Sequence, residues 1–319
     1  MTVQNKLRVA LLAGGKSGER EVSLKGAAEV INALDITKYD IIRYDPATDI
    51  AKLATDAPTI DVVFILLHGL FGEDGTVQGL LDLLGLPYQG SGVLGSALAM
   101  DKDTAKTLYK NRGLPVPNWA MVSPADANNP SSIIHKLGLP LVIKPVRQGS
   151  SLGMSIAHSE NELAAGIRLA FEYDHEVMAE CFVEGREITV GVIGNNSLTP
   201  LPLVEIIPGS EHPFFDYQAK YQPGATREIC PAVFPEEITQ KAQSYGVAAH
   251  RALKLRGYSR TDMIVDKDNN IWVLETNTIP GMTPTSLLPQ AAAAAGLAFD
   301  QLLDRLIALA MEDAGEQRS

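Results

Sequence analysis

Acidic and amide side chains gather in one predicted β-hairpin, where they could bind a metal ion. Two β-rich runs, 261–265 and 271–277, flank a polar turn, which is a typical hairpin signal. If Lys267 pairs with Asn270 across this turn, the register of the two strands follows. Because side chains alternate between the two faces of a strand, four polar residues then share one face. They are Arg260, Asp262, Glu275 and Asn277.

In this register Asp262 lies directly opposite Glu275, with the side chains roughly 5 Å apart. Two carboxylates at that distance repel each other, so the arrangement is tolerable only if a cation sits between them. Hard oxygen ligands suit Mg²⁺, which commonly keeps water molecules and takes further ligands from substrate phosphates. The hairpin therefore predicts a magnesium site. A solvated hairpin edge is the alternative, and a register shift of one residue would place the two acids on opposite faces.

The other face of the hairpin is mostly apolar and is expected to pack against a core. The same register pairs Ile264 with Val273. The residues expected on the core-facing side are Thr261, Met263, Val265, Trp272, Leu274 and Thr276.

The composition is that of an ordinary globular protein and argues against several classes of function. The chain has 319 residues, enough for two or three domains with a substantial core. Its 38 acidic and 27 basic residues give a net charge of −11, which argues against nucleic-acid and anionic-membrane partners. The two cysteines, Cys181 and Cys230, lack a metal-binding spacing, and no apolar run is long enough to span a bilayer. We therefore expect a cytoplasmic protein.

The first hundred residues alternate short apolar strands with helical stretches, which predicts βαβ units and a parallel sheet with ligand-binding loops. Strands are expected at 8–13 and 61–67, and helices at 21–34 and 75–84. The first loop contains Gly-Lys-Ser but lacks the spacing of a P-loop and of Gly-x-Gly-x-x-Gly. It places Glu19 at a helix start, where an acid more often complements the helix dipole than takes part in catalysis. The second loop begins with His68, and if both side chains face one cleft they are candidates for acid–base chemistry.

The middle of the chain carries a loop that could bind phosphate. This Gly/Ser-rich loop connects expected strands at 139–144 and 154–157. Its backbone N–H groups could surround phosphate oxygens while Lys144 supplies a positive charge, although an ordinary flexible hairpin is the alternative. Glu180 and Glu187 could bind an adenine amino group and a ribose, or could be surface charges.

The last part of the chain combines a long loop with two helices. Residues 208–231 form a loop too long for a simple connection inside a compact domain, which favours a functional lid. Helices are expected at 236–256 and 299–311, and a third helix, at 102–111, leads into the middle segment. The last helix has an apolar stripe that is expected in the core, formed by Leu302, Leu303, Leu306, Ile307 and Met311.

Six motifs occur in an order and spacing that are specific in combination. They are Gly14-Gly15-x-Ser17-x-Glu19-Arg20-Glu21-Val22-Ser23, His68-Gly69-x-x-Gly72-Glu73-Asp74-Gly75, Lys144-Pro145-x-x-x-Gly149-Ser150-Ser151-x-Gly153, Asp216-Tyr217-x-x-Lys220-Tyr221, Arg260-x-Asp262, and Glu275-x-Asn277-Thr278-x-Pro280-Gly281-Met282. On these motifs the chain resembles D-alanine:D-alanine ligases of the ATP-grasp superfamily. The resemblance implies an α/β fold with an N-terminal parallel-sheet (Rossmann-like) domain at 1–100. A two-part ATP-grasp fold would follow, with subdomains at 101–185 and 186–319.

The resemblance also implies a reaction and a nucleotide site. The carboxylate of a first D-alanine would attack the γ-phosphate of ATP, and the amine of a second D-alanine would attack the resulting acyl phosphate. Two Mg²⁺ ions, for which Mn²⁺ could substitute, would be held by Asp262, Glu275 and Asn277. The residues expected to contact ATP are Lys102, Lys144, Gly149, Ser151, Glu180, Phe182, Val183 and Glu187.

By the same resemblance, each substrate has its own set of polar contacts. Glu19 and His68 would hold the ammonium group of the first D-alanine. Ser286 and the backbone N–H of Leu287, at the start of a helix, would bind the carboxylate of the second D-alanine with help from Lys220.

Two further roles follow from the resemblance. Arg260 and the backbone N–H of Gly281 would stabilise the oxyanion of the tetrahedral intermediate. Glu19, Ser150 and Tyr221 would be hydrogen-bonded across a closed lid, and the presence of Tyr221 favours D-alanine over D-lactate as second substrate. The resemblance also implies a homodimer.

Three alternatives stay open beside a ligase that makes D-alanyl-D-alanine for peptidoglycan. A related ligase could use another D-amino acid or D-lactate. A nucleotide-binding protein without turnover is disfavoured because Arg260 and the three predicted metal ligands are all present. A Rossmann dehydrogenase is supported only by the first strand and loop, and it fails on the missing Gly-x-Gly-x-x-Gly.

Overall fold

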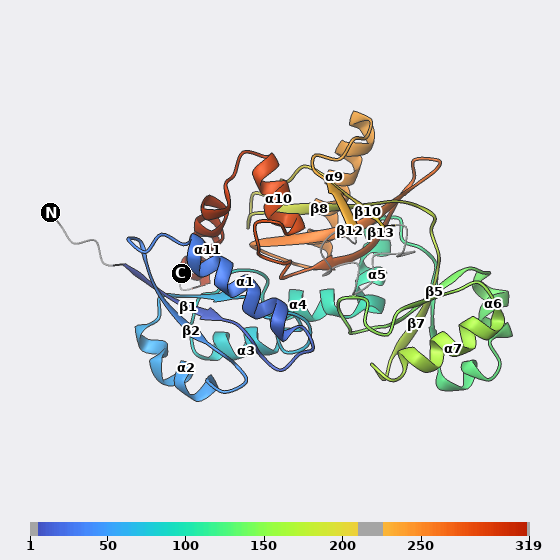
Figure 1. Ribbon diagram of the computed structural model, residues 1–319, viewed down its shortest axis with the longest axis horizontal. Coiled ribbons are helices and arrows are strands. Elements are labelled where there is room, and N and C mark those ends of the chain that lie inside the picture. The colour runs from blue at the N-terminus through green and yellow to red at the C-terminus, as the bar shows by residue number, and fades with distance from the viewer. Residues whose placement is uncertain (1–5, 210–225, 318–319) are drawn as a thin grey trace.

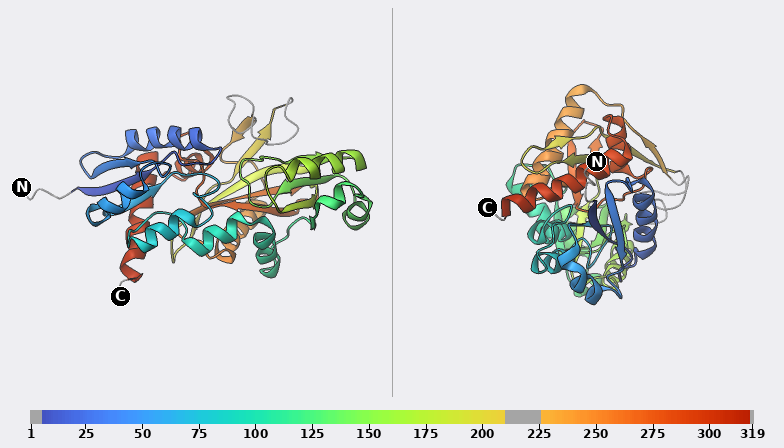
Figure 2. Two further views of the ribbon diagram at one scale, coloured as in Figure 1. Left: turned by 90° about the horizontal axis from the view of Figure 1, so that it is seen from below. Right: turned by 90° about the vertical axis from the view of Figure 1, so that its left-hand side faces the viewer.

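The computed structural model describes residues 6–209 and 226–317 of the chain (Figure 1). These residues form three β-sheets with helices packed around them, in an elongated molecule (Figures 1 and 2). The N-terminal region and the central region lie at opposite ends of the long axis. Lys220, Tyr221 and most of the predicted lid lie outside the described residues, so the predictions for them stay predictions.

A parallel sheet in the order β2-β1-β3 forms the N-terminal region, which confirms the predicted α/β organisation. Its strands are β1 (Leu7–Leu12), β2 (Tyr39–Tyr44) and β3 (Val62–Ile65). β1 and β3 are almost continuously aliphatic and largely buried, as expected for parallel strands that are covered on both faces. The loops that follow these two strands begin at the same edge of the sheet, and they carry Glu19 and His68. The helices of this region are α1 (Arg20–Ala33), α2 (Ile50–Asp56), η1 (Ala57–Thr59), α3 (Thr76–Leu83) and α4 (Val93–Met100).

The central region contains an antiparallel sheet in the order β4-β7-β5-β6. Its strands are β4 (Trp119–Val122), β5 (Leu141–Pro145), β6 (Ser155–Ala157) and β7 (Val177–Cys181). Helix α5 (Lys102–Asn111) has the predicted bounds, and the side chain of Asp101 caps its first turn by accepting a bond from Thr104 N at 2.9 Å. The Gly/Ser-rich loop connects β5 to β6, as predicted. The remaining helices are η2 (Pro124–Ala127), α6 (Ser131–Leu137) and α7 (Glu160–Ala170).

The largest sheet belongs to the C-terminal part and has the order β11-β10-β8-β12-β13, with β9 paired to β8. Its strands are β8 (Gly185–Ile193), β9 (Thr199–Pro200), β10 (Val204–Pro208), β11 (Thr226–Ile229), β12 (Tyr258–Asp266) and β13 (Ile271–Asn277). Strand β8 lies between β10 and β12 and is antiparallel to both. The helices of this part are α9 (Glu236–Ala252), α10 (Leu287–Ala294) and α11 (Phe299–Gln317).

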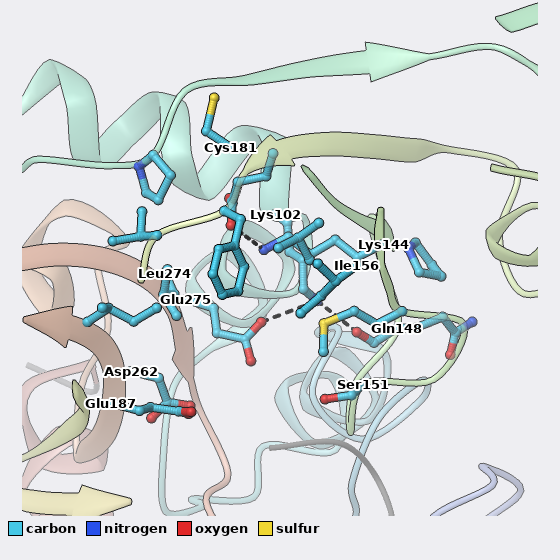
Figure 3. Close-up of a pocket in the computed structure, with 18 of the residues that line it drawn as sticks. Lys102, Lys144, Gln148, Ser151, Ile156, Cys181, Glu187, Asp262, Leu274 and Glu275 are labelled. Atoms are coloured by element: carbon cyan, nitrogen blue, oxygen red, sulfur yellow. Dashed lines mark hydrogen bonds and ion pairs between the residues drawn. The ribbon is translucent and has the colours of Figure 1, made fainter. Parts of the chain in front are cut away.

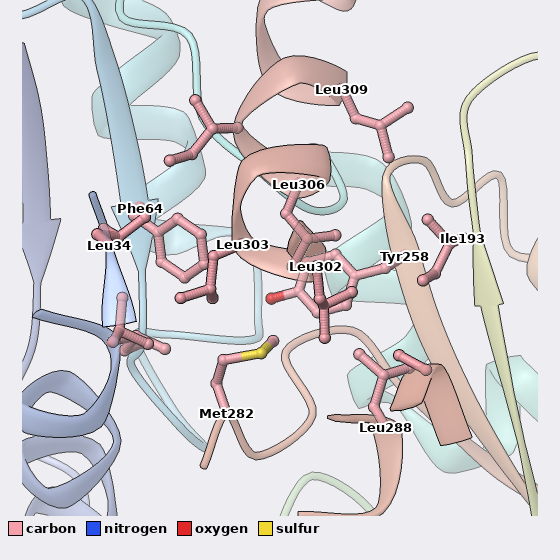
Figure 4. Packing of buried hydrophobic residues seen from close by; sticks show 14 of the residues in the cluster. Leu34, Phe64, Ile193, Tyr258, Met282, Leu288, Leu302, Leu303, Leu306 and Leu309 are labelled. Atoms are coloured by element: carbon pink, nitrogen blue, oxygen red, sulfur yellow. The ribbon is translucent and has the colours of Figure 1, made fainter. Parts of the chain in front are cut away.

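Helix α11 returns to the N-terminal sheet and shares one core with it (Figure 4). The predicted stripe of this helix is confirmed for four residues, of which Leu302, Leu303 and Leu306 are fully buried near Phe64 of β3. Met311 is 37% exposed, so its predicted place in the core is wrong. The residues directly before it, Leu309 and Ala310, are still buried in the same core, so Met311 marks the end of the packed part of the helix. The N-terminal sheet and the end of the chain are therefore held together by apolar packing.

Candidate functional site

The predicted acidic hairpin is formed by β12 and β13, and its register at the acid pair is confirmed. Arg260 pairs with Asn277, and Asp262 pairs with Glu275. Thr261 and Thr276 lie between these pairs, and both are buried on the opposite face. The four polar residues therefore share one face of the hairpin. This face lies toward the central region, as part of the lining of a cavity described below.

A β-bulge follows the acid pair and changes the rest of the hairpin. The register shifts between Asp262 and Met263, because β13 contributes one extra residue there. Beyond the shift Ile264 pairs with Trp272, so the predicted pairing with Val273 is wrong.

The bulge also corrects the predicted apolar face. Val273 and Ile271 are buried, whereas Trp272 and Leu274 are only partly buried, so the prediction that Trp272 and Leu274 face the core is wrong. Leu274 is the extra residue, and it lines the cavity together with its neighbour Glu275. The bulge thus places an apolar and an acidic side chain side by side on the functional face.

A cavity lies between the four-stranded sheet of the central region and this hairpin (Figure 3). Its walls combine positive side chains from one region with acids from the other. Lys102 and Lys144 lie across the cavity from Asp262 and Glu187 (Figure 3). The residues predicted to contact a nucleotide all line the cavity except Gly149, namely Lys102, Lys144, Ser151, Glu180, Phe182, Val183 and Glu187.

Asp262 is the most heavily bonded acid of the site. Arg260 binds it with two parallel hydrogen bonds, from Nε to Oδ1 and from Nη2 to Oδ2, both 2.8 Å long. The Thr189 hydroxyl donates to Oδ1 at 2.7 Å, and the Asn277 amide donates to Oδ2 at 3.1 Å. Burial alone would lower the pKa of Arg260, but the Asp262 carboxylate outweighs it and raises that pKa.

Glu275 also has a cationic neighbour within the protein. Lys102 Nζ lies 3.5 Å from Glu275 Oε2 and donates a hydrogen bond of 2.7 Å to the backbone carbonyl of Gln148 (Figure 3). The opposed acids were expected to need a cation, and in the described structure two side chains supply positive charge beside them. Arg260 balances one carboxylate and Lys102 balances the other.

Sequence reasoning did not identify Lys106, which joins two predicted residues in one buried ion cluster. Lys144 Nζ lies 2.9 Å from Glu180 Oε1, and Lys106 forms an ion pair with the other oxygen of this carboxylate. Glu180 therefore already has two cations around it, and its predicted bond to an adenine amino group stays a prediction. A lysine one turn beyond Lys102 was the only signal of Lys106 in the sequence.

Glu19 lies at the N-terminus of α1, as predicted, yet its side chain does not cap the helix. Its carboxylate instead accepts a hydrogen bond from the Ser150 hydroxyl of the Gly/Ser-rich loop. This bond favours a functional role for Glu19 over simple complementation of the helix dipole. A Cβ atom at Gly69 would lie 2.8 Å from Glu19 Oε2, and one at Gly149 would lie 3.1 Å from the same oxygen. Glycine at both positions therefore lets two loops approach the carboxylate.

The loop that carries Glu19 is held by an acid that sequence reasoning missed. Asp45, just after β2, accepts hydrogen bonds from Arg20 Nη2 at 2.6 Å and from Gly15 N at 2.9 Å. The hydrogen bond from Arg20 lowers the pKa of Asp45 to about 2. A Cβ atom at Gly14, where φ is +97°, would lie 2.6 Å from this carboxylate. These contacts fix the turn from which α1 begins.

The second N-terminal loop is joined to the end of β13 through the backbone of Ile279. Glu73 accepts hydrogen bonds from Gly69 N at 2.8 Å and from Ile279 N at 3.3 Å. The Ile279 side chain is buried in the core on the same side of the N-terminal sheet as Leu12. Burial lowers the pKa of His68, and burial with the nearby Glu19 charge raises the pKa of Glu73 to about 7. Glu73 was part of a motif but had no predicted role.

Gly281 and Ser286 are brought together after β13. A Cβ atom at Gly281 would lie 3.0 Å from Ser286 Oγ. Ser286 is the N-cap residue of α10, which begins at Leu287, as predicted. Its hydroxyl is 2.8 Å from the Thr283 hydroxyl and does not cap the helix. The first N–H groups of α10 are thus left for another acceptor.

The donor set of the hairpin fits Mg²⁺ only with help from a substrate. Within residues 6–209 and 226–317, no three His, Cys, Asp or Glu side chains lie close enough together to hold a metal ion. Asp262, Glu275 and Asn277 offer two carboxylates and one amide oxygen. These are the hard oxygen ligands that Mg²⁺ binds together with phosphate oxygens and water.

Among the residues that the structure describes, no helix has both the length and the apolar character that crossing a bilayer requires.

Family models match most of the chain. The model described as D-ala D-ala ligase C-terminus matches residues 108–308, and the model described as D-ala D-ala ligase N-terminus matches residues 46–91.

Two curated relatives are similar over nearly their whole length. The chain is 58% identical over 308 residues to a D-alanine–D-alanine ligase of Desulfotalea psychrophila, covering 96% of each chain. It is 57% identical over 308 residues to a D-alanine–D-alanine ligase of Syntrophobacter fumaroxidans, covering 97% of this chain and 99% of the relative.

Solved structures of similar proteins share the fold. A D-alanine–D-alanine ligase from Bacillus anthracis complexed with ATP superimposes with a TM-score of 0.85 at 34% identity, covering 98% of this chain and 99% of that one. The VanG D-Ala:D-Ser ligase from Enterococcus faecalis superimposes with a TM-score of 0.84, also at 34% identity, covering 96% of this chain and 100% of that one.

Proposed function

This chain belongs to the D-alanine–D-alanine ligase family and has the ATP-grasp fold, and we propose that its cavity binds ATP and joins two D-alanine molecules to D-alanyl-D-alanine. The protein is a carboxylate–amine ligase, and its product would supply peptidoglycan synthesis. One observation carries the assignment of the site. The Ser150–Glu19 hydrogen bond closes the Gly/Ser-rich loop over a cavity that has lysines on one wall and carboxylates on the other.

The nucleotide is proposed to lie between the central sheet and the hairpin. Lys102 and Lys144 would meet the phosphates, and the backbone N–H groups from Gly149 to Ser151 would cover them. Phe182 and Val183 line the same cavity and would hold the adenine ring together with Glu180, while Glu187 would hold the ribose.

The reaction is proposed to proceed in two steps. A carboxylate oxygen of the first D-alanine attacks the γ-phosphorus, the bond to the β,γ-bridging oxygen breaks, and ADP leaves. The neutral amine of the second D-alanine then attacks the acyl carbon, and phosphate leaves with the oxygen that came from the first carboxylate. Because water would hydrolyse the acyl phosphate, the site must be closed during both steps. The Ser150–Glu19 contact supplies part of that closure.

Arg260 is suited to stabilise the tetrahedral oxyanion of the second step. Nε and one hydrogen of Nη2 bind Asp262, so Nη1 and the second hydrogen of Nη2 are the donors that can reach the substrate. The Asp262 bonds hold the guanidinium plane in place before the charge develops. The backbone N–H of Gly281 would be the second donor, and one such donor contributes roughly 10²- to 10³-fold in rate.

Two Mg²⁺ ions are proposed to bind at Asp262, Glu275 and Asn277, with Mn²⁺ as a substitute. Bound there, the metal would neutralise charge on the transferring phosphoryl group. Asp262 and Glu275 line the cavity, and Asn277 is hydrogen-bonded to Asp262. Arg260 already contacts Asp262 and Lys102 already contacts Glu275. Each carboxylate would therefore bind both its basic side chain and the metal.

Each substrate is proposed to use a separate set of groups. Glu19 and His68, which are both buried, would hold the ammonium of the first D-alanine. The Ser286 hydroxyl and the Leu287 N–H would bind the carboxylate of the second D-alanine at the start of α10. Lys220 would assist there and Tyr221 would complete the closure, and both roles stay predictions.

We also propose that the protein works in the cytoplasm, where ATP is available, and as a homodimer. Leu83 of α3 and Leu94 of α4 are 88% and 54% exposed on two helices that pack together, which supports an interface on this side. Sedimentation velocity tests the dimer. A monomer at micromolar concentration would contradict it.

A product assay tests the proposed function. Purified protein with ATP and Mg²⁺ is given D-alanine, L-alanine, D-alanine with D-serine, D-alanine with D-lactate, or no amino acid. Phosphate release and product mass are then followed. We expect D-alanyl-D-alanine and phosphate in equal amounts whenever D-alanine is present. Phosphate without dipeptide, or no phosphate, would contradict the proposal. If the only product joined D-alanine to D-serine or to D-lactate, the second substrate would be that compound and not D-alanine.

A further inference from the structure

Lys106 is fully buried, and the reaction proposed above gives it no role. It lies on α5 one turn beyond Lys102, and its ammonium forms an ion pair with Glu180. A lysine is almost never fully buried unless a partner compensates its charge. The position of Lys106 therefore needs an explanation from its surroundings.

The arrangement of Glu180 and Lys144 follows from the central sheet. Glu180 on β7 pairs with Val142 on β5, and Lys144 is two residues further along β5. The two side chains are diagonal neighbours on one face of the sheet, within reach of a direct ion pair. The distance of 2.9 Å between Lys144 Nζ and Glu180 Oε1 shows that they form one.

This pairing has a consequence for phosphate binding. A buried carboxylate so close to Lys144 would cancel the charge that the nucleotide phosphates need. Lys106 adds a second cation to the other oxygen of Glu180, so the cluster has a net charge of +1 when both lysines are protonated. Burial alone would raise the pKa of Glu180, but Lys144 and Lys106 outweigh it and keep that pKa low.

The position of Lys106 is set by packing on the same sheet. Trp119 on β4 pairs with Glu180 across the strands, and Lys106 Nζ lies 5.3 Å from the centre of its ring. The indole N–H of Trp119 donates a hydrogen bond of 2.6 Å to Asp103, also on α5. Helix α5 is thus seated so that Lys106 faces Glu180.

We propose that Lys106 is a positioning residue for phosphate binding: it neutralises Glu180 and thereby leaves the charge of Lys144 available to the phosphates of the nucleotide. The inference rests on the proposed nucleotide site. It assigns Lys106 no contact with the substrate.

Calorimetric titration with ATP and with adenosine, each with Mg²⁺ and without D-alanine, tests the proposal. Lys106→Met is expected to weaken ATP binding about tenfold or more and to weaken adenosine binding much less, because adenosine has no phosphates for Lys144 to contact. Lys110→Met is the matched control. Lys110 is on the same helix, is exposed, and lies 5.9 Å from the same Trp119 ring, so this variant should bind ATP like the wild type.

A second substitution separates charge balance from structural support. Adding Glu180→Gln to Lys106→Met removes the carboxylate that cancels Lys144, so ATP affinity should recover to within about threefold of Glu180→Gln alone. A structural role would give no such recovery. If Lys106→Met does not fold, Lys106→Gln replaces it with the same expectations.

Three results would overturn the inference: unchanged ATP affinity in Lys106→Met, equal losses for ATP and adenosine, or no recovery in the double variant. Failure of the proposed nucleotide site can be told apart from failure of this inference, because the wild type itself would then not bind ATP.

Discussion

Ser150 Oγ donates a hydrogen bond to Glu19 Oε1, and this contact joins the loop after β1 to the glycine-rich loop of the central sheet. The two residues are 131 positions apart, so the contact depends on how the N-terminal and central regions meet. It is the described part of the closure that an acyl phosphate requires.

Ser150→Ala should lower the rate of dipeptide formation about 10- to 100-fold, because it removes a hydrogen bond to a charged group, worth roughly 1.5–3 kcal/mol. It should also release phosphate in excess of dipeptide, since water gains access. Ser131→Ala is the matched control. It removes another Ser–Glu bond, 2.9 Å long, between Ser131 and Glu160 on the surface of the central region. Equal phosphate and dipeptide in Ser150→Ala would argue against a closing role.

Gly149→Ala should reduce kcat/KM for D-alanine about tenfold, because overpacking costs about 1–3 kcal/mol. The new Cβ atom would lie 3.1 Å from Glu19 Oε2, so the carboxylate or the loop would have to shift by a few tenths of an ångström. Gly18→Ala, next to Glu19 in sequence, meets nothing within 4 Å and should keep wild-type kinetics. If both variants behave alike, the close approach at Gly149 has no function.

Glu275→Gln should reduce turnover about 100-fold or more while the melting temperature stays close to that of the wild type, because a bound metal contributes several kcal/mol to phosphoryl transfer. The fold should persist because Lys102 and Arg260 already balance the two acids. The Mg²⁺ concentration for half-maximal rate should rise as well. Asp268→Asn removes the same charge from the exposed turn of the hairpin and serves as control. An active Glu275→Gln variant would reject the metal assignment.

Glu73 should make stability depend on pH. Burial and the Glu19 charge raise the pKa of Glu73 to about 7, against 4.5 as its ordinary value. Between these values the folded state binds one proton more than the unfolded state, so the free energy of unfolding falls as pH rises from about 4.5 to 7. Glu73→Gln removes this loss, and relative to the wild type it should gain about 2 kcal/mol between pH 5 and pH 7.5.

Urea unfolding at pH 5, 6 and 7.5 measures this difference. Glu172→Gln, at an exposed position, is the control for the loss of one carboxylate. Parallel pH curves for the wild type and Glu73→Gln would mean that Glu73 is ionised as easily in the folded chain as in the unfolded one.

Local patterns were enough to predict those elements that are set by local interactions. The bounds of α5 follow from Asp101 as N-cap and from the Gly113 and Pro115 breakers, and the hairpin register at Asp262 and Glu275 follows from alternation around a short turn. β2 was not predicted, because the exposed residues Asp40 and Arg43 interrupt the apolar pattern of this edge strand.

Features that depend on distant contacts could not be predicted. No residue pattern in the sequence indicates the bulge at Leu274. Because of the bulge, Trp272 and Leu274 do not face the core. Asp45 and Lys106 belong to no motif, and each acquires its role only when the fold brings it to a partner. The cationic balance of the acid pair was missed for the same reason, since Lys102 comes from another region of the chain.

The central claim is that this ligase activates the first D-alanine as an acyl phosphate. D-Alanine labelled with ¹⁸O in its carboxylate, supplied with ATP and Mg²⁺, tests it by mass spectrometry of the released phosphate. We predict one ¹⁸O atom in the phosphate for each molecule of D-alanyl-D-alanine formed. Unlabelled phosphate, or ¹⁸O recovered in AMP, would contradict the account.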